Sequence, residues 1–238
     1  MPGSWEIVNQ RDKRLLVAVL VPPDLAVTMD FAQNIRNLQL PPGSDFMRMG
    51  GMPFGPARNQ CAKTALDNGY HLAFLDADVR APPDAFIKLV ETGLDLVGGL
   101  YFQRFYPYMP VMFNEGKDDK GNPTKIPVTG WKPGDIVPCT YVPSGLTLYR
   151  RRLLEAMFSR FPRPFEWGVD VAPIPAENGQ VPPFSEDFTF SWRAKQLGVQ
   201  PYILTGVVGL HEVRAVVGPR WLLPYPSNDP YHGLVALV

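Results

Sequence analysis

A short apolar run that ends in two carboxylates constrains this sequence more than any other feature. Residues Leu72–Leu75 are all apolar, and Asp76 and Asp78 follow with only Ala77 between them. An apolar run without polar alternation predicts a strand buried on both faces, as strands of parallel sheets are. In open α/β sheets, ligands bind beyond the carboxyl ends of strands, which is where the two aspartates lie.

Paired carboxylates at such a position have two interpretations. They suit a divalent cation that carries phosphates, because such ions bind through one or two carboxylates plus oxygens of the substrate. They also suit a simple turn before a helix, since aspartate is common in turns and helix starts, and Pro83 and Asp84 follow closely. An Asp-x-Asp pattern alone does not decide between the two.

The first half of the chain alternates strand and helix patterns. The expected elements are a strand at 15–21, a helix near 28–38, a Gly- and Met-rich connection at 47–54, a helix at 57–68, the strand at 72–75, a helix from 83 to 93 and a strand at 94–100. Such alternation predicts βαβ units. We therefore expect an α/β fold, a single Rossmann-like domain over 1–238 with a mostly parallel central sheet flanked by helices.

The second half is less regular and rich in proline. The expected elements are a loop or hairpin tip within 103–132, strand-like stretches in 136–149, a helix at 150–161, a long loop at 161–184, a helix at 185–197 and a strand at 202–208. Loops longer than about 12–15 residues often bind ligands in compact domains. Phe165 and Trp167 in the 161–184 loop would suit a sugar or another flat partner, and packing of the loop onto the body explains them equally well.

Two further polar groups follow these loops. Ser185 fits an N-cap, and Glu186 and Asp187 occupy the first helical turn, where the helix dipole favours negative charge. His211 comes just after the last strand. An acidic first turn and a lone histidine are each more often structural than catalytic.

Composition excludes several classes of protein. Hydrophobic residues make up 45% of the chain and charged residues 19%, as in ordinary globular proteins rather than disordered ones. Lys plus Arg equals Asp plus Glu at 23 each, so no net field attracts nucleic acid or an anionic membrane. The two cysteines form neither a disulfide framework nor a zinc site, which favours a reducing, cytoplasmic location.

The N-terminal part imitates a signal peptide without matching one. Arg11 to Arg14 precede the apolar run Leu15–Val21, but that run is short and is followed by Pro22-Pro23 instead of a small-residue cleavage site. We interpret it as the first core strand. No run approaches the roughly 18 apolar residues that a membrane helix needs, so we expect no membrane span.

Taken in order, the motifs resemble the GT-A-fold glycosyltransferases, in particular the family 2-like enzymes. The resemblance covers most of the chain. The segments that carry it are Ala57-Arg58-Asn59, Leu75-Asp76-Ala77-Asp78, Pro82-Pro83-Asp84, Val97-Gly98-Gly99-Leu100-Tyr101-Phe102, Ser144-Gly145 with the residues up to Arg151, Ser185-Glu186-Asp187 and Leu210-His211. It implies a GT-A domain with a nucleotide-binding half at 1–100 and an acceptor-binding half at 101–238.

For the donor, the resemblance implies a nucleotide-sugar, with a UDP-sugar favoured, and a Mn²⁺ or Mg²⁺ cofactor. It places Arg58, Asp76, Ala77 and Asp78 with the donor-binding residues, Asp76 near the nucleoside. Asp78 would bind the metal together with His211, and Asp76 is included among the metal-site residues. One departure is that Val21-Pro22-Pro23 lacks the acidic residue that many relatives use for the nucleobase, with Asp24 as the nearest substitute.

For the acceptor, the resemblance implies a hexosyltransferase-like enzyme that glycosylates a hydroxyl group. Asp187 would be the catalytic base, which inverts the anomeric centre by direct displacement. Glu186 and Trp192 would contact the acceptor, while helical periodicity also allows Trp192 to face the core. The loops 102–132 and 161–184 would select the acceptor, which the sequence leaves open among a glycan, a small molecule, a protein and a modified nucleic acid.

Two other classes stay open. A nucleotidyltransferase of similar fold would also use metal-binding carboxylates, but it should carry a Gly-rich basic phosphate loop near the first strand, and Leu20–Leu25 shows none. A non-catalytic sugar-nucleotide-binding protein would be expected to have lost part of its site. The four residues that such decay would remove are all present: Asp76, Asp78, Asp187 and His211.

Overall fold

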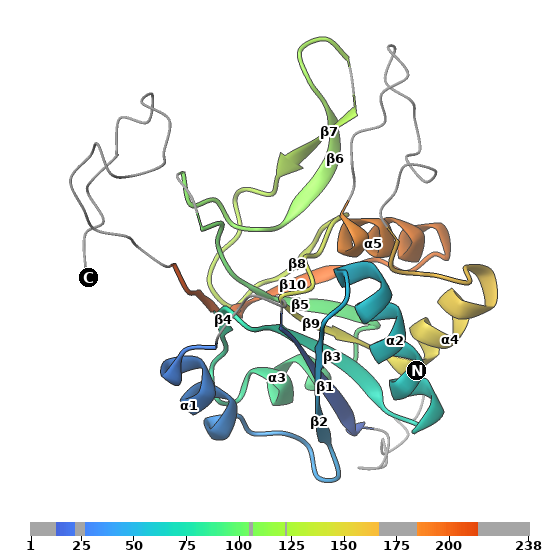
Figure 1. Ribbon diagram of the computed structural model, residues 1–238. Helices are drawn as coiled ribbons and strands as arrows, with labels where there is room; N and C mark the ends of the chain where they lie inside the picture. The colour runs from blue at the N-terminus through green and yellow to red at the C-terminus, as the bar shows by residue number, and fades with distance from the viewer. Residues whose placement is uncertain (1–12, 22–26, 105–106, 122, 167–184, 214–238) are drawn as a thin grey trace, which may run out of the picture.

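One seven-stranded sheet, with helices on both faces, forms the centre of the molecule (Figure 1). The structure is a computed structural model that describes residues 13–21, 27–104, 107–121, 123–166 and 185–213. The sheet strands, in spatial order, are β2 (Asp45–Gly50), β1 (Leu15–Val21), β3 (His71–Asp76), β9 (Leu146–Tyr149), β5 (Leu96–Leu100), β10 (Tyr202–Val208) and β8 (Ile136–Pro138). The described helices are α1 (Met29–Asn37), α2 (Phe54–Asp67), α3 (Ala85–Glu91), α4 (Arg151–Arg160) and α5 (Glu186–Gln196).

The sheet is mainly parallel, with two reversed strands. β2, β1, β3, β5 and β10 run in one direction, because β1 pairs in parallel with β2 and β3, and β5 does so with β10. β9 is antiparallel to both β3 and β5, and β8 is antiparallel to β10. The expected α/β class with a mostly parallel sheet is confirmed.

Strand β1 shows why both faces of the sheet are apolar. All seven of its residues are buried. Leu15, Val17 and Val19 pack on the side of α1 and α3, whereas the alternate residues pack on the side of α2, α4 and α5. Successive side chains of a strand point to opposite faces, so a continuous apolar run is what a strand between two helical layers requires.

The reversed strand β9 determines which residues lie beside the carboxyl end of β3. In register, Leu75 near the end of β3 pairs with Leu146 at the start of β9. The Asp76 N–H donates to the carbonyl of Gly145 at 2.9 Å. The Ser144-Gly145 segment therefore lies beside the aspartates that end β3.

Two small sheets complete the described structure. β6 (Phe113–Lys117) and β7 (Pro123–Pro127) form a hairpin that stands away from the central sheet above α5 (Figure 1). β4 (Val79–Arg80) pairs with β11 (Leu210–His211), so the last described strand lies next to the Asp78 turn. The expectation of a hairpin tip within 103–132 agrees with this hairpin.

The expected connection at 47–54 is wrong, because residues 45–50 form β2, an edge strand paired in parallel with β1. β2 contains no fully buried residue, so it lacks the apolar run that would have revealed it. Met47 and Met49 alone turn inward, onto the α2 side of the core. Residues 167–184 of the expected long loop lie outside the described residues.

Cys61 and Cys139 are free and buried, as expected of a chain without a disulfide framework. Burial raises the pKa of Cys61 to about 11 and that of Cys139 to about 12, so both thiols stay protonated at neutral pH. In the described part of the chain, no helix has both the length and the apolar character needed to cross a membrane.

A side chain at Gly99 of β5 should destabilise the fold. A Cβ at this position would lie 2.6 Å from Cδ2 of the fully buried Leu146 and 3.0 Å from Cγ1 of Val207. Overpacking of this kind destabilises by about 1–3 kcal/mol, so we expect Gly99→Ala to lower the free energy of unfolding in urea by that amount. Leu146→Val in the same molecule should recover part of the loss, measured as a double-mutant cycle. A Gly99→Ala protein as stable as the wild type would contradict this packing.

Candidate functional site

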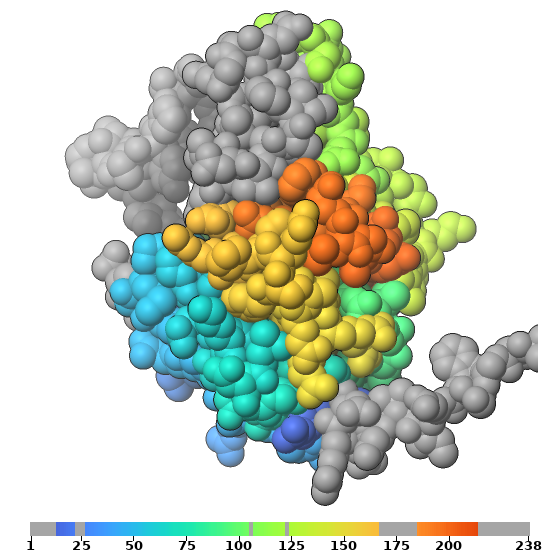
Figure 2. Space-filling model, turned by 90° about the vertical axis from the view of Figure 1, so that its right-hand side faces the viewer, coloured from blue at the N-terminus to red at the C-terminus, as the bar shows by residue number. Residues whose placement is uncertain are grey.

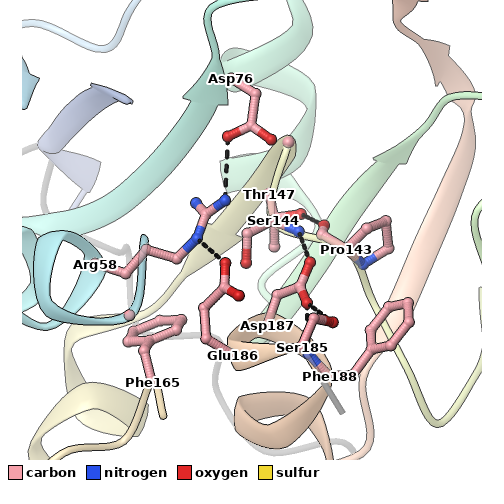
Figure 3. A network of polar contacts seen from close by, with 12 residues as sticks. Arg58, Asp76, Pro143, Ser144, Thr147, Phe165, Ser185, Glu186, Asp187 and Phe188 are labelled. Atoms are coloured by element: carbon pink, nitrogen blue, oxygen red, sulfur yellow. Dashed lines mark hydrogen bonds and ion pairs between the residues drawn. The ribbon is translucent and has the colours of Figure 1, made fainter. Parts of the chain in front are cut away.

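The guanidinium of Arg58 lies at the centre of the candidate site. Its Nη2 donates to Oδ1 of Asp76 at 3.1 Å, and its Nε donates to Oε1 of Glu186 at 3.0 Å (Figure 3). The Arg58 side chain is 3% exposed and its guanidinium lies 4.6 Å from the centre of the Phe74 ring. One buried cation thus joins the end of β3 to the start of α5.

Contacts at the start of α2 position Arg58 in the site. Asn59 donates through Nδ2 to the Phe165 carbonyl and accepts from the Phe165 N–H, which ties the helix to the chain leading toward α5. A Cβ on Gly55 would lie 3.2 Å from the same carbonyl, so the close approach requires a small residue. The segment Ala57-Arg58-Asn59 therefore places its charged side chain inward and its amide on a neighbouring backbone.

Burial and neighbouring charges together raise the pKa values of Arg58, Asp76 and Glu186. Burial alone would lower the pKa of Arg58, but Asp76 and Glu186 raise it above its ordinary value. Burial raises the pKa of Asp76 despite the opposing charge of Arg58. The pKa of Glu186 is also raised, by burial and by the neighbouring charge of Asp187. The site holds more negative charge than Arg58 can neutralise.

Asp78 and His211 face each other across a short gap. His211 Nε2 lies 3.6 Å from Asp78 Oδ2, because β11 pairs with β4 and sets His211 opposite Val79. Nδ1 of His211 lies 2.7 Å from the Phe102 carbonyl, an acceptor, so Nδ1 carries the hydrogen of this bond. In neutral His211, Nε2 then presents a lone pair toward the carboxylate of Asp78.

This pair fits a metal ion as a partial set of ligands. Two lone-pair donors that face each other are what a cation bridges, and a histidine fixed through its other nitrogen is typical of metal ligands. Among the described residues, no three His, Cys, Asp or Glu side chains gather into a metal-binding group. An ion held here would therefore take its remaining ligands from substrate phosphates and water, as Mg²⁺ and similar ions commonly do.

Arg104 currently pairs with the same carboxylate. Its Nη1 lies 2.7 Å from Oδ2 of Asp78. Burial would raise the pKa of Asp78, but the hydrogen bond and charge that His211 supplies when it is protonated, together with Arg104, lower it. The carboxylate is therefore ionised at neutral pH and ready to accept a cation. No pattern in the sequence singled out Arg104.

Asp187 lies at the start of α5, and both of its carboxylate oxygens accept hydrogen bonds. Oδ2 accepts from the Ser144 N–H at 3.1 Å, and Oδ1 accepts from the Phe188 N–H at 2.8 Å and from the Ser185 hydroxyl (Figure 3). Ser185 occupies the N-cap position as expected, but its side chain makes no capping bond to the helix backbone. Glu186 is 4% exposed beneath Arg58, so the two adjacent acids of α5 have separate surroundings.

Other sequence candidates lie mostly in the core. Ala77 is buried, and Trp192 is partly buried against the aromatic cluster of Phe113, Tyr141 and Phe188. Phe165 is 1% exposed and stacks on Phe190 with ring centres 4.3 Å apart, so it packs the loop onto the body. Asp24 and Trp167 lie outside the described residues.

The backbone at Gly145 packs closely against Tyr101 and Asp76 at the site. The Gly145 N–H donates to the Tyr101 hydroxyl at 3.0 Å. A Cβ at this position would lie 2.6 Å from that hydroxyl and 3.1 Å from Asp76 Oδ2, so only glycine fits. Burial raises the pKa of Tyr101 well above its ordinary value, and the charge of Asp76 raises it further. The sequence indicated strand-like stretches around this segment and included Ser144-Gly145 in the resemblance, but it gave these two residues no role of their own.

An apolar cavity of about 330 Å³ adjoins the charged cluster. It lies between the ends of β1 and β2 and the start of α2, lined in part by Leu20, Met49, Met52 and Phe54. The Phe54 ring also lies 5.8 Å from the guanidinium of Arg58. A flat apolar group in this cavity would thus lie next to Arg58 and Asp76.

Asp76→Asn should stabilise the fold at pH 7. The pKa of Asp76 is higher in the folded state than in the unfolded state, where it is about 3.9. Above the folded-state pKa, the ionised carboxylate therefore lowers the free energy of unfolding. This cost decreases as the pH falls below the folded-state pKa and is gone below the unfolded-state pKa. A neutral amide can still accept from Arg58. We expect a higher urea midpoint for Asp76→Asn at pH 7, with the difference narrowing in acid.

The control for this prediction is Asp95→Asn. Asp95 also pairs with an arginine, Arg152, but lies just before β5, away from the site. We therefore expect that Asp95→Asn does not raise the urea midpoint at pH 7. If Asp76→Asn is less stable than the wild type at pH 7, the attraction to Arg58 outweighs the burial of Asp76.

Comparison with known proteins supports the fold. No protein-family model matches the sequence, and no curated protein matches it. Among solved structures, A197 from STIV is similar with a TM-score of 0.55 and 17% identity, over 84% of this chain and 86% of that one. GalNAc-T7, solved with UDP, GalNAc and Mn²⁺, is similar with a TM-score of 0.50 and 12% identity, over 87% of this chain and 45% of that one. These likenesses show a Rossmann-like GT-A fold and, at such identities, the fold alone.

Proposed function

We propose that the protein is a metal-dependent glycosyltransferase that transfers a sugar from a UDP-sugar to an acceptor hydroxyl with inversion. One observation carries the proposal. At the carboxyl edge of β3, Arg58 binds Asp76 and Glu186, and Asp78 faces His211 across 3.6 Å. Donor, metal and base candidates, which are far apart in the sequence, thus come together at the edge where α/β sheets bind ligands.

The donor nucleoside would enter the apolar cavity beside α2. Its base would lie against Met49, Met52 and Phe54, and its ribose and phosphates would point toward Asp76 and Asp78. Nη1 of Arg58 is buried and finds no hydrogen-bond partner among the described residues, which is costly unless a ligand supplies one. GalNAc-T7, of similar fold, was solved with UDP, which supports a nucleotide as a ligand of this fold.

The metal-binding residues would be Asp78 and His211. A bound Mn²⁺ or Mg²⁺ ion supplies positive charge against the diphosphate that leaves as the sugar transfers. The chain itself holds His211 in place through the Phe102 carbonyl, and the charge of Arg104 acts to lower the pKa of Asp78. Arg104 would have to leave Oδ2 of Asp78 when the ion binds, and its guanidinium would then be free to pair with phosphate oxygens.

Asp187 would take the proton from the acceptor hydroxyl. Oδ1 already accepts two hydrogen bonds and Oδ2 accepts one, from the Ser144 N–H, so Oδ2 keeps a lone pair for the substrate. The bonds from the backbone of Ser144 and Phe188 fix the orientation of the carboxylate. Attack by the deprotonating hydroxyl on the face opposite the leaving diphosphate inverts the anomeric centre.

Metal-coupled nucleotide binding tests the donor site. UDP at about 100 times its dissociation constant should stabilise the wild type by about 2.7 kcal/mol in Mn²⁺, seen as a rise in melting temperature, and far less in a chelator. His211→Ala should abolish the Mn²⁺ dependence while the ligand-free protein melts as before. His71→Ala is the matched control, because His71 begins β3 at the opposite edge of the sheet.

Two outcomes would count against this part of the proposal. If no nucleoside diphosphate shifts melting in Mn²⁺, the glycosyltransferase assignment fails. If UDP binds equally well in the chelator, or His211→Ala responds to Mn²⁺ like the wild type, the metal site fails and the nucleotide site remains.

The base assignment is tested by exchanging the two acids of α5 one at a time. Asp187→Asn should slow UDP release from UDP-sugars by about 10²–10⁴-fold, the usual contribution of a general base, while Mn²⁺–UDP binding is kept. Glu186→Gln should keep most of the chemical step and weaken nucleotide binding, because Glu186 supports Arg58. Near wild-type turnover in Asp187→Asn would rule out Asp187 as the base and favour a retaining mechanism.

A further inference from the structure

The hairpin β6–β7 brings an ammonium group to the acceptor side of the candidate site. Nζ of Lys125, on β7, lies 4.7 Å from the centre of the Phe188 ring and 6.0 Å from that of Phe113. Phe188 follows Asp187 directly and donates its N–H to Oδ1 of that residue. Figure 2 shows α5 lying between the hairpin and α4 on one face of the molecule.

The aromatic rings that hold Lys125 also connect the hairpin to α5. Phe113 of β6, Tyr141 and Phe188 form one buried cluster, with ring centres 5.4–5.9 Å apart between Phe188 and the other two. The base of the hairpin is therefore fixed relative to Asp187. A cation over an aromatic face is held there by the ring quadrupole.

The ammonium of Lys125 has no ion-pair partner within the described part of the chain. Glu115 stands opposite Lys125 in the hairpin register, but its carboxylate pairs with Lys195 at 3.8 Å and accepts a hydrogen bond from the Tyr141 hydroxyl. Burial lowers the pKa of Lys125, and the charge of Asp187 acts against this shift. The side chain nevertheless remains accessible to solvent. A ligand can reach this cation without breaking an existing salt bridge.

The same geometry limits what the hairpin can recognise. Sugars often bind proteins by stacking on an exposed aromatic face, but Phe188 is only 7% exposed and Lys125 covers its ring. What this surface offers beside Asp187 is a positive charge. A negatively charged group is what such a surface would bind.

We propose that Lys125 selects an acceptor that carries a carboxylate or a phosphate near the hydroxyl to be glycosylated. The inference rests on the proposed function, in which the hydroxyl meets Oδ2 of Asp187. Without a counter-charge, an anionic acceptor would be repelled by Asp187, Asp76 and the donor diphosphate. Lys125 offsets that repulsion and fixes the orientation of the acceptor.

The test compares matched acidic and neutral sugars. Glucuronate supplies the carboxylate, glucose 6-phosphate supplies the phosphate, and glucose is the neutral reference. Lysine residues of the full chain are dimethylated with ¹³C and observed by NMR in the presence of Mg²⁺ and UDP, and Lys125→Met identifies the Lys125 signal. We expect one or both acidic sugars to shift that signal at concentrations where glucose does not.

A variant pair extends the test to affinity. Lys125→Met should weaken binding of the acidic sugar by about 10- to 100-fold, the range for hydrogen bonds to charged groups, and leave Mn²⁺–UDP binding unchanged. Lys120→Met, at the tip of the same hairpin, is the control and should bind like the wild type. Preserved UDP binding in Lys125→Met separates this inference from the proposed function, because the donor site of the proposed function is tested by nucleotide binding and not by binding of the acidic sugar.

Three results would overturn the inference. The first is a Lys125 signal that responds to neither acidic sugar more than to glucose. The second is an equal response of Lys120 and Lys125, which would mean unspecific attraction of anions. The third is an equal loss of binding for acidic and neutral sugars in Lys125→Met, which would make Lys125 a support for Asp187 without acceptor selectivity.

Discussion

The buried guanidinium of Arg58 is the interaction on which the rest of the site depends. A charge removed from water must be compensated by opposite charge and hydrogen bonds, and two carboxylates from β3 and α5 provide this. The donor side and the acceptor side of the site are therefore held together by one cation. Burial raises the pKa values of Asp76 and Glu186 despite the charge of Arg58, so keeping these two carboxylates ionised at neutral pH costs folding free energy. Such a burden is common where function needs charges close together.

The reversed strand β9 supplies the second requirement. In an all-parallel sheet, the loops at the carboxyl edge would each leave a strand, whereas β9 enters the sheet at this edge. Its first neighbours, Ser144 and Gly145, therefore offer backbone groups beside Asp76 and Asp187. Backbone donors have fixed directions and no rotamer freedom, so they orient a carboxylate more strictly than side chains do. The small residue at 145 allows this close approach.

Much of the scaffold could be predicted from the sequence, because the patterns that indicate its strands and helices each lie within a few consecutive residues. The apolar run of β1, the aspartates after β3 and the acidic first turn of α5 are each visible within a few residues, and the structure brings them to one edge. Strand β2 was missed because an exposed edge strand shows no apolar run. Arg104 and Lys125 were missed because they come from a loop and a hairpin whose approach to the site is decided by packing over long sequence distances. The chemical roles of the site residues stay predictions.

Asp187 differs from the other three acids of the site in its counter-charges, and this difference is a physical reason to assign it the role of the base. Asp76 and Glu186 share Arg58, and Asp78 contacts Arg104 and His211. Protonation of an ion-paired carboxylate would remove its attraction to the cation. Asp187 has no ion pair among the described residues, and the hydrogen bonds to its oxygens come from the neutral groups of Ser144, Ser185 and Phe188. Of the four carboxylates at this edge, Asp187 can therefore accept a proton without breaking a salt bridge, which is the property that a base for the acceptor hydroxyl requires.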